Sequence, residues 1–331
     1  MSDFDNSLMT ILVADDQEPN RELLSAMLIA EGYQVICAED GEKALSLIQS
    51  HQVDLALLDV VMPRRSGFTV CQLTKSSPET RLIPIVLITG LDKPDDRVHG
   101  AMCGADDFLS KPVNKHELLA RVHSLMQLKQ FTDEMDNAEA VLFSLALSIE
   151  AKDPYTEGHC DRLSKYSIKL AEKLRLPDEL RRALRRGGLV HDIGKLAVPE
   201  RILLKPGPLT PEERKVMEQH TIEGERICAP LRSFRHVLPI IRHHHEKRDG
   251  SGYPDGLKGE QIPLTARILQ ITDIYDALTT DRPYRKALSA EEAFAIMREE
   301  VKRGWWDGFI LDEFEAVVRS HEPVHPAGSR S

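Results

Sequence analysis

Five short runs of apolar, strand-forming residues recur through residues 10–126, and amphipathic stretches such as Glu22–Ala30 and Glu42–Gln49 separate them. Repeated strand–helix units of this length predict a parallel sheet with helices on both faces. The sequence therefore predicts a small doubly wound α/β domain, whose ligands should bind at the carboxyl ends of the strands. The expected strands are Ile11–Ala14, Gln34–Cys37, Leu55–Leu58, Ile85–Thr89 and Asp107–Leu109.

A different pattern begins after this domain. Between Pro112 and Pro154 the chain contains neither Gly nor Pro, and apolar residues recur at alternating spacings of three and four. So narrow an apolar seam predicts a helix that extends from the first domain and pairs with a second chain. Packing of this helix on its own domain is the alternative. The seam residues are Leu128, Phe131, Met135, Ala138, Leu142, Leu145 and Ile149.

From Asp153 onwards the sequence has helical periodicity and no alternating strand pattern, so we expect an all-α domain there. A chain of 331 residues has room for two domains. We therefore predict an α/β domain at residues 1–126, a helical, coiled-coil-like linker at 127–147 and an all-α domain at 148–331.

Charge and composition exclude several classes of protein. The chain has 43 basic and 53 acidic residues, a net charge of −10, which argues against a general nucleic-acid binder and against a polybasic membrane clamp. No apolar stretch approaches the roughly 20 residues that span a bilayer, and the amino terminus lacks the features of a secretory signal. Five scattered cysteines are typical of reduced thiols. We expect a cytoplasmic protein.

Polar residues end several of the predicted strands. Asp15 and Asp16 close the first strand, Asp59 the third and Thr89 the fourth, and Lys111 follows the fifth. These ends converge in a doubly wound sheet, and three carboxylates in one pocket need a cation such as Mg²⁺. A carboxylate beside Mg²⁺ can accept a phosphoryl group, which Thr89 can hydrogen-bond and Lys111 can neutralise. Taken singly, each Asp would be read as a helix N-cap.

With these five residues in place, residues 10–126 resemble the receiver domain of two-component response regulators. The resemblance implies that Asp59 is the phosphoacceptor, that Asp15 and Asp16 hold Mg²⁺, and that Phe108 occupies the aromatic switch position. It also implies a cognate histidine kinase as partner. A degenerate receiver that is not phosphorylated is the alternative.

Histidine and aspartate recur through the second domain in a pattern that suits metal ligation. His191 and Asp192 are adjacent on what we expect to be a buried helix, where both need partners, and Lys195 lies one turn further on the same face. Five histidines and two aspartates exceed one tetrahedral site and suit two metals with a bridging carboxylate, a device for phosphoester hydrolysis. Imidazole and carboxylate without thiolate fit Fe or Mn at least as well as Zn. The candidate ligands are His159, His191, Asp192, His220, His244, His245 and Asp273.

Two further segments add binding chemistry. His244 and His245 can lean toward one ion, and the Gly-rich segment 249–254 is a turn that can approach a ligand closely. Arg282 and Arg285 are placed to hold phosphate oxygens through bidentate bonds. Tyr253 and Tyr284 can stack on a base or hydrogen-bond a phosphate. The alternative for the arginines is pairing with surface carboxylates.

Together these segments resemble the HD-GYP family of HD-domain metal phosphohydrolases. The resemblance runs from about Leu142 to Val318 and rests on the His220 segment and on HDIGK at 191–195, HHE at 244–246, DGSGYP at 249–254 and DIYDALTTDRPYR at 273–285. It implies hydrolysis of cyclic di-GMP to linear pGpG and leaves further hydrolysis to GMP open. A sister specificity of the family for cyclic GMP-AMP also stays open.

The resemblance also implies roles for single residues. His191, Asp192 and Asp273 would bind one metal, and Asp192 would bridge to a second one. The family's first histidine corresponds to His159, which can also ligate. The second metal would be completed by His220, His244 and His245. Asp192 and Lys195 are the expected catalytic residues, and the expected substrate-binding residues are Lys195, Tyr253, Asp276, Arg282 and Arg285.

One position departs from the pattern of some family members, which hold a third metal through a glutamate four residues before the first histidine. This chain has Tyr155 there. A phenol with an ordinary pKa of about 10 is a poor ligand at neutral pH. We therefore predict two metals.

The sequence therefore predicts a receiver domain as input, a helical linker and a hydrolase domain as output. Phosphorylation of Asp59 adds about −1.5 to −2 charges, and we hypothesise that the linker helix then reorients the two hydrolase domains of a homodimer. A catalytically silent cyclic-dinucleotide sensor or protein-interaction module is one alternative. A generic HD phosphohydrolase of nucleotides such as (p)ppGpp or dNTPs is another. No DNA-binding module or membrane partner is expected.

Overall fold

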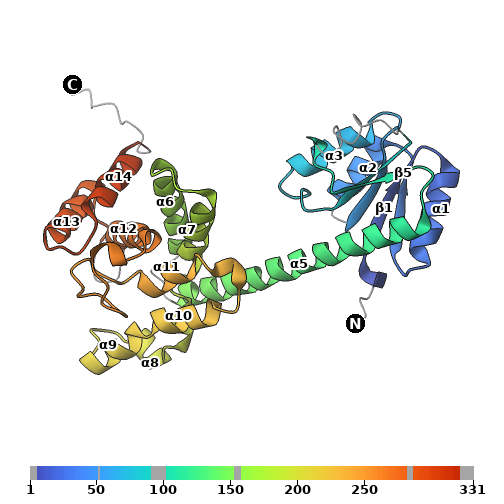
Figure 1. The fold of residues 1–331 in the computed structure, drawn as a ribbon. Helices are drawn as coiled ribbons and strands as arrows, with labels where there is room; N and C mark the ends of the chain where they lie inside the picture. Colours follow the sequence, from blue (N-terminus) through green and yellow to red (C-terminus); the bar gives the residue numbers. More distant parts are fainter. Residues whose placement is uncertain (1–5, 51–52, 91–101, 153–157, 282–285, 321–331) are drawn as a thin grey trace, which may run out of the picture. The chain divides into compact units, whose positions relative to one another are not determined.

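The computed structural model describes residues 6–50, 53–90, 102–152, 158–281 and 286–320 (Figure 1). The chain divides into two compact units, an α/β unit at residues 1–138 and a helical unit at residues 139–331. Each unit is described by itself below.

The α/β unit contains one parallel five-stranded sheet with the strand order β2-β1-β3-β4-β5. Every residue of β3 and β4 is buried, as a parallel sheet covered on both faces requires, and this explains why the sequence shows continuous apolar runs there. The strands lie within one residue of those expected, so the doubly wound fold is confirmed. They are β1 (Thr10–Ala14), β2 (Gln34–Ala38), β3 (Leu55–Asp59), β4 (Ile85–Thr89) and β5 (Asp107–Ser110).

Helices cover the two faces of this sheet. Successive strand residues point to opposite faces, so Leu12 and Leu58 lie in one core cluster and Ile11 and Leu57 in another. Helices α2 and α3 contribute to the first cluster, and α1 and the beginning of α5 to the second. The helices are α1 (Glu18–Ile29), α2 (Gly41–Gln49), α3 (Gly67–Ser76) and α5 (Lys115–Lys152), and a short 3-10 turn, η1 (Asn6–Leu8), precedes the sheet.

Helix α5 is 38 residues long and includes the boundary between the two units. The predicted seam divides along this helix. Near its end Ile149 is buried in the core of the helical unit, with Leu142 partly buried against that core. Earlier in the helix Leu128 and Phe131 are 62% and 58% exposed, and Met135 is also exposed. Leu142 and Ile149 therefore pack on their own domain, as in the alternative interpretation, whereas the beginning of the seam and also Leu145 are exposed.

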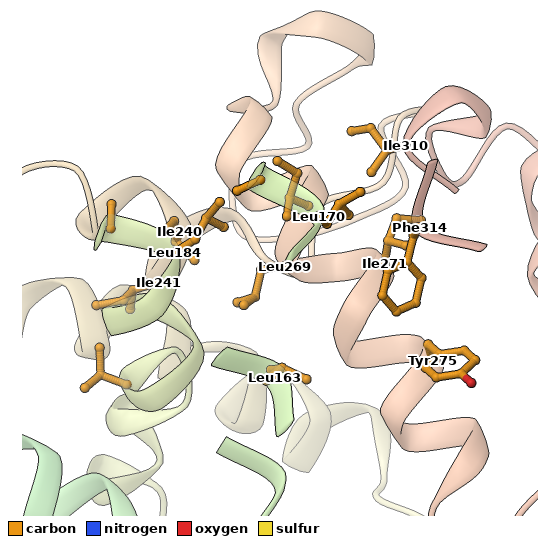
Figure 2. Packing of buried hydrophobic residues seen from close by; sticks show 14 of the residues in the cluster. Leu163, Leu170, Leu184, Ile240, Ile241, Leu269, Ile271, Tyr275, Ile310 and Phe314 are labelled. Carbon is orange, nitrogen blue, oxygen red and sulfur yellow. The ribbon is translucent and has the colours of Figure 1, made fainter. Parts of the chain in front are cut away.

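The helical unit contains no strand among the residues that the structure describes, which confirms the all-α prediction. Its core joins side chains of α6, α7, α11, α12 and α14, such as Leu170, Leu184, Ile241, Leu269 and Phe314 (Figure 2). Its helices are α6 (His159–Lys173), α7 (Asp178–Val190), α8 (Glu200–Leu203), α9 (Pro211–Glu218), α10 (His220–Cys228), α11 (Leu238–His243), α12 (Leu264–Thr279), α13 (Ala290–Lys302) and α14 (Gly308–Arg319). Three 3-10 turns connect them, η2 (Ile193–Ala197), η3 (Arg232–Phe234) and η4 (Gly259–Gln261).

Helix α12 runs through the centre of this unit. Ten of its sixteen residues are buried, including polar ones such as Thr272 and Asp276, and its aromatic ring Tyr275 packs against Phe294 and Phe314 with centroids 5.0 and 5.1 Å away. A helix buried nearly all round places its polar side chains inside the domain. Asp276 therefore faces other helices rather than bulk water, whereas Asp273 is partly buried.

The segment HDIGK does not continue helix α7, so the expectation that it lies on one helix is wrong. Helix α7 ends at Val190, and His191 follows as its C-cap. The 3-10 turn η2 comes next in the chain and packs against the first residues of α10. A Cβ atom at Gly194 would lie 1.8 Å from the carbonyl oxygen of His220 and 2.5 Å from the backbone nitrogen of Gly224, so only glycine permits this approach. The turn brings Asp192 and His220 together.

Replacing Gly194 by alanine should strongly destabilise the helical unit, because a backbone carbonyl cannot move aside. Overpacking costs about 1–3 kcal/mol or more, which corresponds to a fall of about 2–12 °C in the thermal midpoint of a unit of this size. The matched control is Gly187→Ala, whose Cβ would lie 2.9 Å from the side chain of Ile240, which can repack. Calorimetry should show a much smaller loss for the control. Equal losses in the two variants would contradict this account.

Candidate phosphoacceptor pocket and metal centre

The carboxyl edge of the sheet brings three aspartates and one lysine together. Carboxylate oxygens of Asp15, Asp16 and Asp59 lie within 4.8 Å of one another. The ammonium of Lys111 lies 2.8 Å from Asp15 Oδ2 and 2.7 Å from Asp59 Oδ2. Burial raises the pKa of the Asp59 carboxyl, and the ion pair with Lys111 only partly opposes this. A divalent cation and a phosphoryl group would both find suitable partners here.

Two further residues of the predicted receiver site lie on neighbouring strands. Thr89 is buried at the end of β4, the strand that pairs with β3 and therefore with Asp59. Phe108 lies on β5 and packs, half-buried, against the core cluster that Leu58 and Leu87 share. Thr89 thus lies at the carboxyl edge of the sheet, and Phe108 pairs with Leu87, two residues before that edge.

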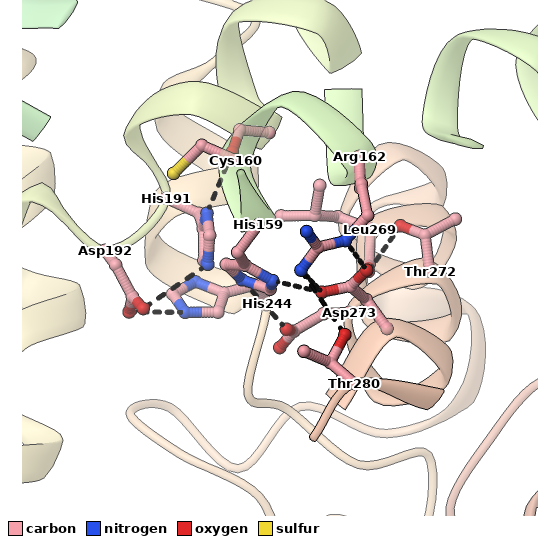
Figure 3. Close-up of polar contacts among 12 residues, drawn as sticks. His159, Cys160, Arg162, His191, Asp192, His244, Leu269, Thr272, Asp273 and Thr280 are labelled. Carbon is pink, nitrogen blue, oxygen red and sulfur yellow. Dashed lines mark hydrogen bonds and ion pairs between the residues drawn. The ribbon is translucent and has the colours of Figure 1, made fainter. Parts of the chain in front are cut away.

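Among the described residues, the helical unit holds three groups of metal-ligating side chains whose donor atoms lie within 4.8 Å of one another, and two of these groups contain the candidate ligands. The third group is His243, Glu246 and Asp255. The first donor group is His159, His191 and Asp273, from the start of α6, the end of α7 and α12. The second donor group is Asp192, His220, His244 and His245, from the turn after α7, the start of α10 and the end of α11. The structure thus brings together all seven candidate ligands; Figure 3 shows five of them, drawn from both groups.

Asp192 lies between the two donor groups. Its Oδ2 is 3.4 Å from His191 Nε2, and its Oδ1 is 3.3 Å from His220 Nε2. Oδ1 is buried and accepts no hydrogen bond from the described residues. Burial opposes ionisation, but the charges of Lys195 and His191 outweigh it and hold the pKa of Asp192 well below its usual range. A carboxylate with one oxygen toward each group fits a bridging ligand.

Hydrogen bonds fix the orientation of several imidazoles. Nδ1 lies within hydrogen-bond distance of the carbonyl three residues earlier in His191, His220 and His244, at 3.3, 2.7 and 2.8 Å. Donation from Nδ1–H leaves Nε2 as the free lone pair, which is the tautomer that a metal ligand needs. Burial also lowers the pKa of His220 to about 4 and that of His245 well below its usual value, so both rings are neutral at pH 7. The donor set therefore fits divalent metals.

Asp276, which the sequence suggested as a substrate-binding residue, contacts two side chains of α6. It is 2% exposed, lies 2.7 Å from Nδ1 of His159 and accepts a hydrogen bond from Nε of Arg162 at 2.6 Å. A carboxylate behind an imidazole holds the ring and raises its basicity. Sequence reasoning missed Arg162, although its place three residues after His159 puts both on one face of α6.

Glu246 was also not assigned a role from the sequence. It is fully buried, and its carboxylate accepts backbone hydrogen bonds from Asp255 at 2.7 Å and Leu257 at 3.1 Å. This ties the Gly-rich segment back onto the end of α11, where a Cβ at Gly252 would lie 2.2 Å from a backbone nitrogen. The ring of Tyr253 then lies with its centroid 4.9 Å from that of His245. Tyr253 thus borders the second donor group.

A pocket opens beside the first donor group. His159, His191, Asp192 and Lys195 form its polar side, and Lys195 Nζ lies 2.6 Å from Asp192 Oδ2. The remaining lining residues are Ala146, Ile149, Glu150, Cys160, Leu189, Ile193, Leu203 and Leu204. The candidate residues Tyr155, Arg282, Tyr284 and Arg285 lie outside the described residues. None of the described helices has the length and hydropathy needed to cross a bilayer.

Comparisons with known proteins match both units. A family model described as a response regulator receiver domain matches residues 11–123, and one described as an HD domain matches residues 144–310. The "Probable cyclic di-GMP phosphodiesterase" of Vibrio cholerae is 37% identical over an alignment that covers 95% of this chain and 79% of that protein. The chain belongs to the HD-GYP response regulators.

Two other relatives of this HD-GYP protein differ in the substrate that their names give. The "Cyclic di-GMP phosphodiesterase response regulator RpfG" of Xanthomonas campestris is 36% identical over 312 residues, which cover 87% of this chain and 82% of that protein. The "3'3'-cGAMP-specific phosphodiesterase 3" of Vibrio cholerae is 41% identical over 163 residues, which cover 49% of this chain and 35% of that protein.

Replacing Asp276 by alanine should weaken binding of Mn²⁺ to the HD-GYP domain, because His159 loses the group that orients it. Loss of such a partner typically costs about 10–100-fold in metal affinity. Asp276→Asn keeps an acceptor oxygen and should lose less. The control is Asp161→Ala, since Asp161 is exposed on α6 and pairs only with Lys165. Titration calorimetry with Mn²⁺ measures all three, and unchanged affinity in Asp276→Ala would contradict the proposed orientation.

Proposed function

We propose that this protein is a response regulator whose HD-GYP domain is a two-metal phosphodiesterase that hydrolyses cyclic di-GMP to linear pGpG. The observation that carries the proposal is the position of Asp192 between two donor groups, with one oxygen toward each. The names of two relatives that align with most of this chain support cyclic di-GMP as the substrate.

In this proposal each donor group holds one divalent metal, and Asp192 is shared between them. Imidazole and carboxylate donors without thiolate favour iron or manganese. Two such metals would supply Lewis-acid activation of the phosphodiester and of the attacking water. We propose two metals rather than three, because Tyr155 occupies the position four residues before His159 where a glutamate would hold a third metal.

Other residues of the chain bind and orient the substrate. Lys195 lies at the pocket edge, where its ammonium can neutralise a phosphate oxygen close to Asp192. Tyr253 presents a ring beside His245 on which a base can stack. Arg282 and Arg285 are proposed to hold the second phosphate through bidentate bonds. Asp276 holds His159 instead of contacting the substrate.

The receiver domain supplies the control in this proposal. A cognate histidine kinase would phosphorylate Asp59, Asp15 and Asp16 would hold Mg²⁺, and Lys111 would move from its ion pair with Asp59 to the phosphoryl group. Thr89 and Phe108 would then report the modification to the rest of the domain. The proposed domains are the receiver domain at residues 1–126, the helical linker at 127–147 and the HD-GYP domain at 148–331.

The exposed beginning of the seam is the proposed dimer contact. Leu128, Phe131 and Met135 follow one another at spacings of three and four on α5, and all three are exposed. Burying them against the same residues of a second copy would remove apolar surface from water. We therefore propose a homodimer formed through the linker helix.

Product analysis tests the catalytic proposal. The protein should be purified without oxygen, loaded with Fe²⁺ or Mn²⁺, and incubated with cyclic di-GMP. We expect pGpG from the wild type and at least a hundredfold less from Asp192→Ala, because the shared carboxylate is lost. Chromatography of the products measures both. The matched control is Asp255→Ala, since Asp255 pairs with Arg242 outside both donor groups.

Parallel reactions separate this proposal from its alternatives. Hydrolysis of 3'3'-cyclic GMP-AMP but not of cyclic di-GMP would favour the other substrate of the family. Hydrolysis of (p)ppGpp or dNTPs alone would favour a generic phosphohydrolase. Tight binding of cyclic di-GMP without any product, with and without phosphodonor, would favour a silent sensor.

A phosphodonor such as acetyl phosphate should change both the turnover and the dimerisation of the wild type. Asp59→Asn should abolish both changes because it removes the acceptor. Phe131→Glu should keep the chain monomeric, since it places a charge in the proposed seam. Leu23→Glu is its control, because Leu23 is equally exposed on α1. Light scattering measures the mass, and an Asp59→Asn protein that still responds would overturn the control mechanism.

A further inference from the structure

Glu150, in the last turn of α5, caps the helix that carries a metal ligand. Its Oε1 accepts a hydrogen bond from the backbone nitrogen of Cys160 at 3.2 Å. Cys160 is the second residue of α6, and His159 is the first. The N-cap residue of α6 is Gly158, which has no side chain to accept from the first backbone N–H groups. Glu150 therefore supplies from another helix the acceptor that α6 lacks.

The charge of Glu150 also suits this place. A negative charge is favourable beside the amino terminus of a helix, where the first N–H groups are unpaired. Burial and the neighbouring carboxylate of Glu150 raise the pKa of the Cys160 thiol, so this thiol stays protonated. Glu150 and His159 line the same pocket. The carboxylate of Glu150 thus connects helix α5 to the start of α6, which carries a ligand of the first donor group.

The end of α5 is anchored on the helices that carry the ligands. Ala146 and Ile149 are buried in the core shared with α6 and α7. Further back, Glu139 pairs with Arg186 of α7 at 2.9 Å. The same helix begins in the receiver domain, where Leu118 and Val122 are fully buried in its core. A movement of α5 caused by the receiver domain would therefore displace Ala146, Ile149 and Glu150, which line the pocket.

We propose that Glu150 is a positioning residue through which helix α5 sets the place of the metal ligand His159. A shift or rotation of α5 changes the distance between the Glu150 carboxylate and the start of α6. His159 then moves relative to His191 and Asp273, and the first donor group closes or opens. This link to the receiver rests on the proposed function, whereas the effect on metal binding does not.

The first test measures metal binding by the full-length chain. Glu150→Ala removes the acceptor and should weaken Mn²⁺ binding at the first donor group by about tenfold. Glu150→Gln keeps an acceptor oxygen at the same position and should restore most of the affinity. The matched control is Glu139→Ala, which removes another carboxylate of α5 that pairs with α7 and not with α6. Titration calorimetry, with His159→Ala as the reference for a lost ligand, gives the affinities.

The second test compares turnover with and without phosphodonor. Wild type and Glu150→Gln should respond alike, whereas the response of Glu150→Ala should fall at least fivefold. A Glu150→Ala protein that binds Mn²⁺ as tightly as the wild type, or that responds as fully, overturns the proposal. So does an equal loss of affinity in Glu139→Ala, since that indicates general loosening of α5. Should Glu150→Ala not fold, Glu150→Asp shortens the side chain by one methylene and is expected to show the same losses.

These tests separate the failure of this proposal from that of the proposed function. If the wild type releases no product from cyclic di-GMP, the Mn²⁺ affinities alone still decide the role of Glu150. If the wild type is active and Glu150→Ala keeps its affinity, the hydrolase stands and the positioning role falls.

Discussion

The carboxylate of Asp192 lies within 3.4 Å of imidazole nitrogens from two different parts of the chain, and one of its oxygens is buried without a hydrogen-bond donor. Burying a carboxylate in this way is costly unless a cation pairs with it. Lys195 pairs with the other oxygen, at 2.6 Å. Positive charge would therefore be stabilising where the two donor groups adjoin. Divalent metals bound by the neutral imidazoles would supply that charge.

The surrounding fold prepares those imidazoles for metal binding. The carbonyls that lie next to Nδ1 of His191, His220 and His244 belong to the ends of α7, α9 and α11, so the helix that precedes each histidine selects its tautomer. For His159, at the start of α6, the partner of Nδ1 is Asp276 of α12. The central burial of α12 explains why this partner comes from a helix more than 100 residues away.

The sequence predicted the strands well and picked out candidate ligands that the structure brings together, because each has a local signature. Continuous apolar runs mark β3 and β4, since both faces of these strands are covered. The ligands recur in short motifs around His191, His244 and Asp273. The end of α7 at Val190 was missed, because the turn depends on how closely Gly194 approaches His220. That approach is a property of packing between segments distant in sequence.

Residues that hold a ligand or its helix in place were not recognised from the sequence, for the same reason. Asp276 looked like a substrate ligand because it follows Asp273 by one helical turn, yet it pairs with His159 and Arg162. Periodicity shows which residues share a face but not which helix covers that face. Glu246 and Glu150 likewise bind backbone nitrogens 9–11 residues away in the chain, and nothing in their spacing marks this.

Helix α5 shows how one apolar pattern can serve two purposes. Its seam has a single periodicity from Leu128 to Ile149, so sequence alone treats it as one surface. In the structure Ile149 belongs to the core of the HD-GYP domain, whereas Leu128 and Phe131 stay exposed. The buried part fixes the helix to the domain that contains the two donor groups, and the exposed part leaves apolar area that a second chain would cover in the proposed dimer. Because Ile149 lines the pocket beside the first donor group, the proposed control by the receiver would act on the metal centre through this end of α5.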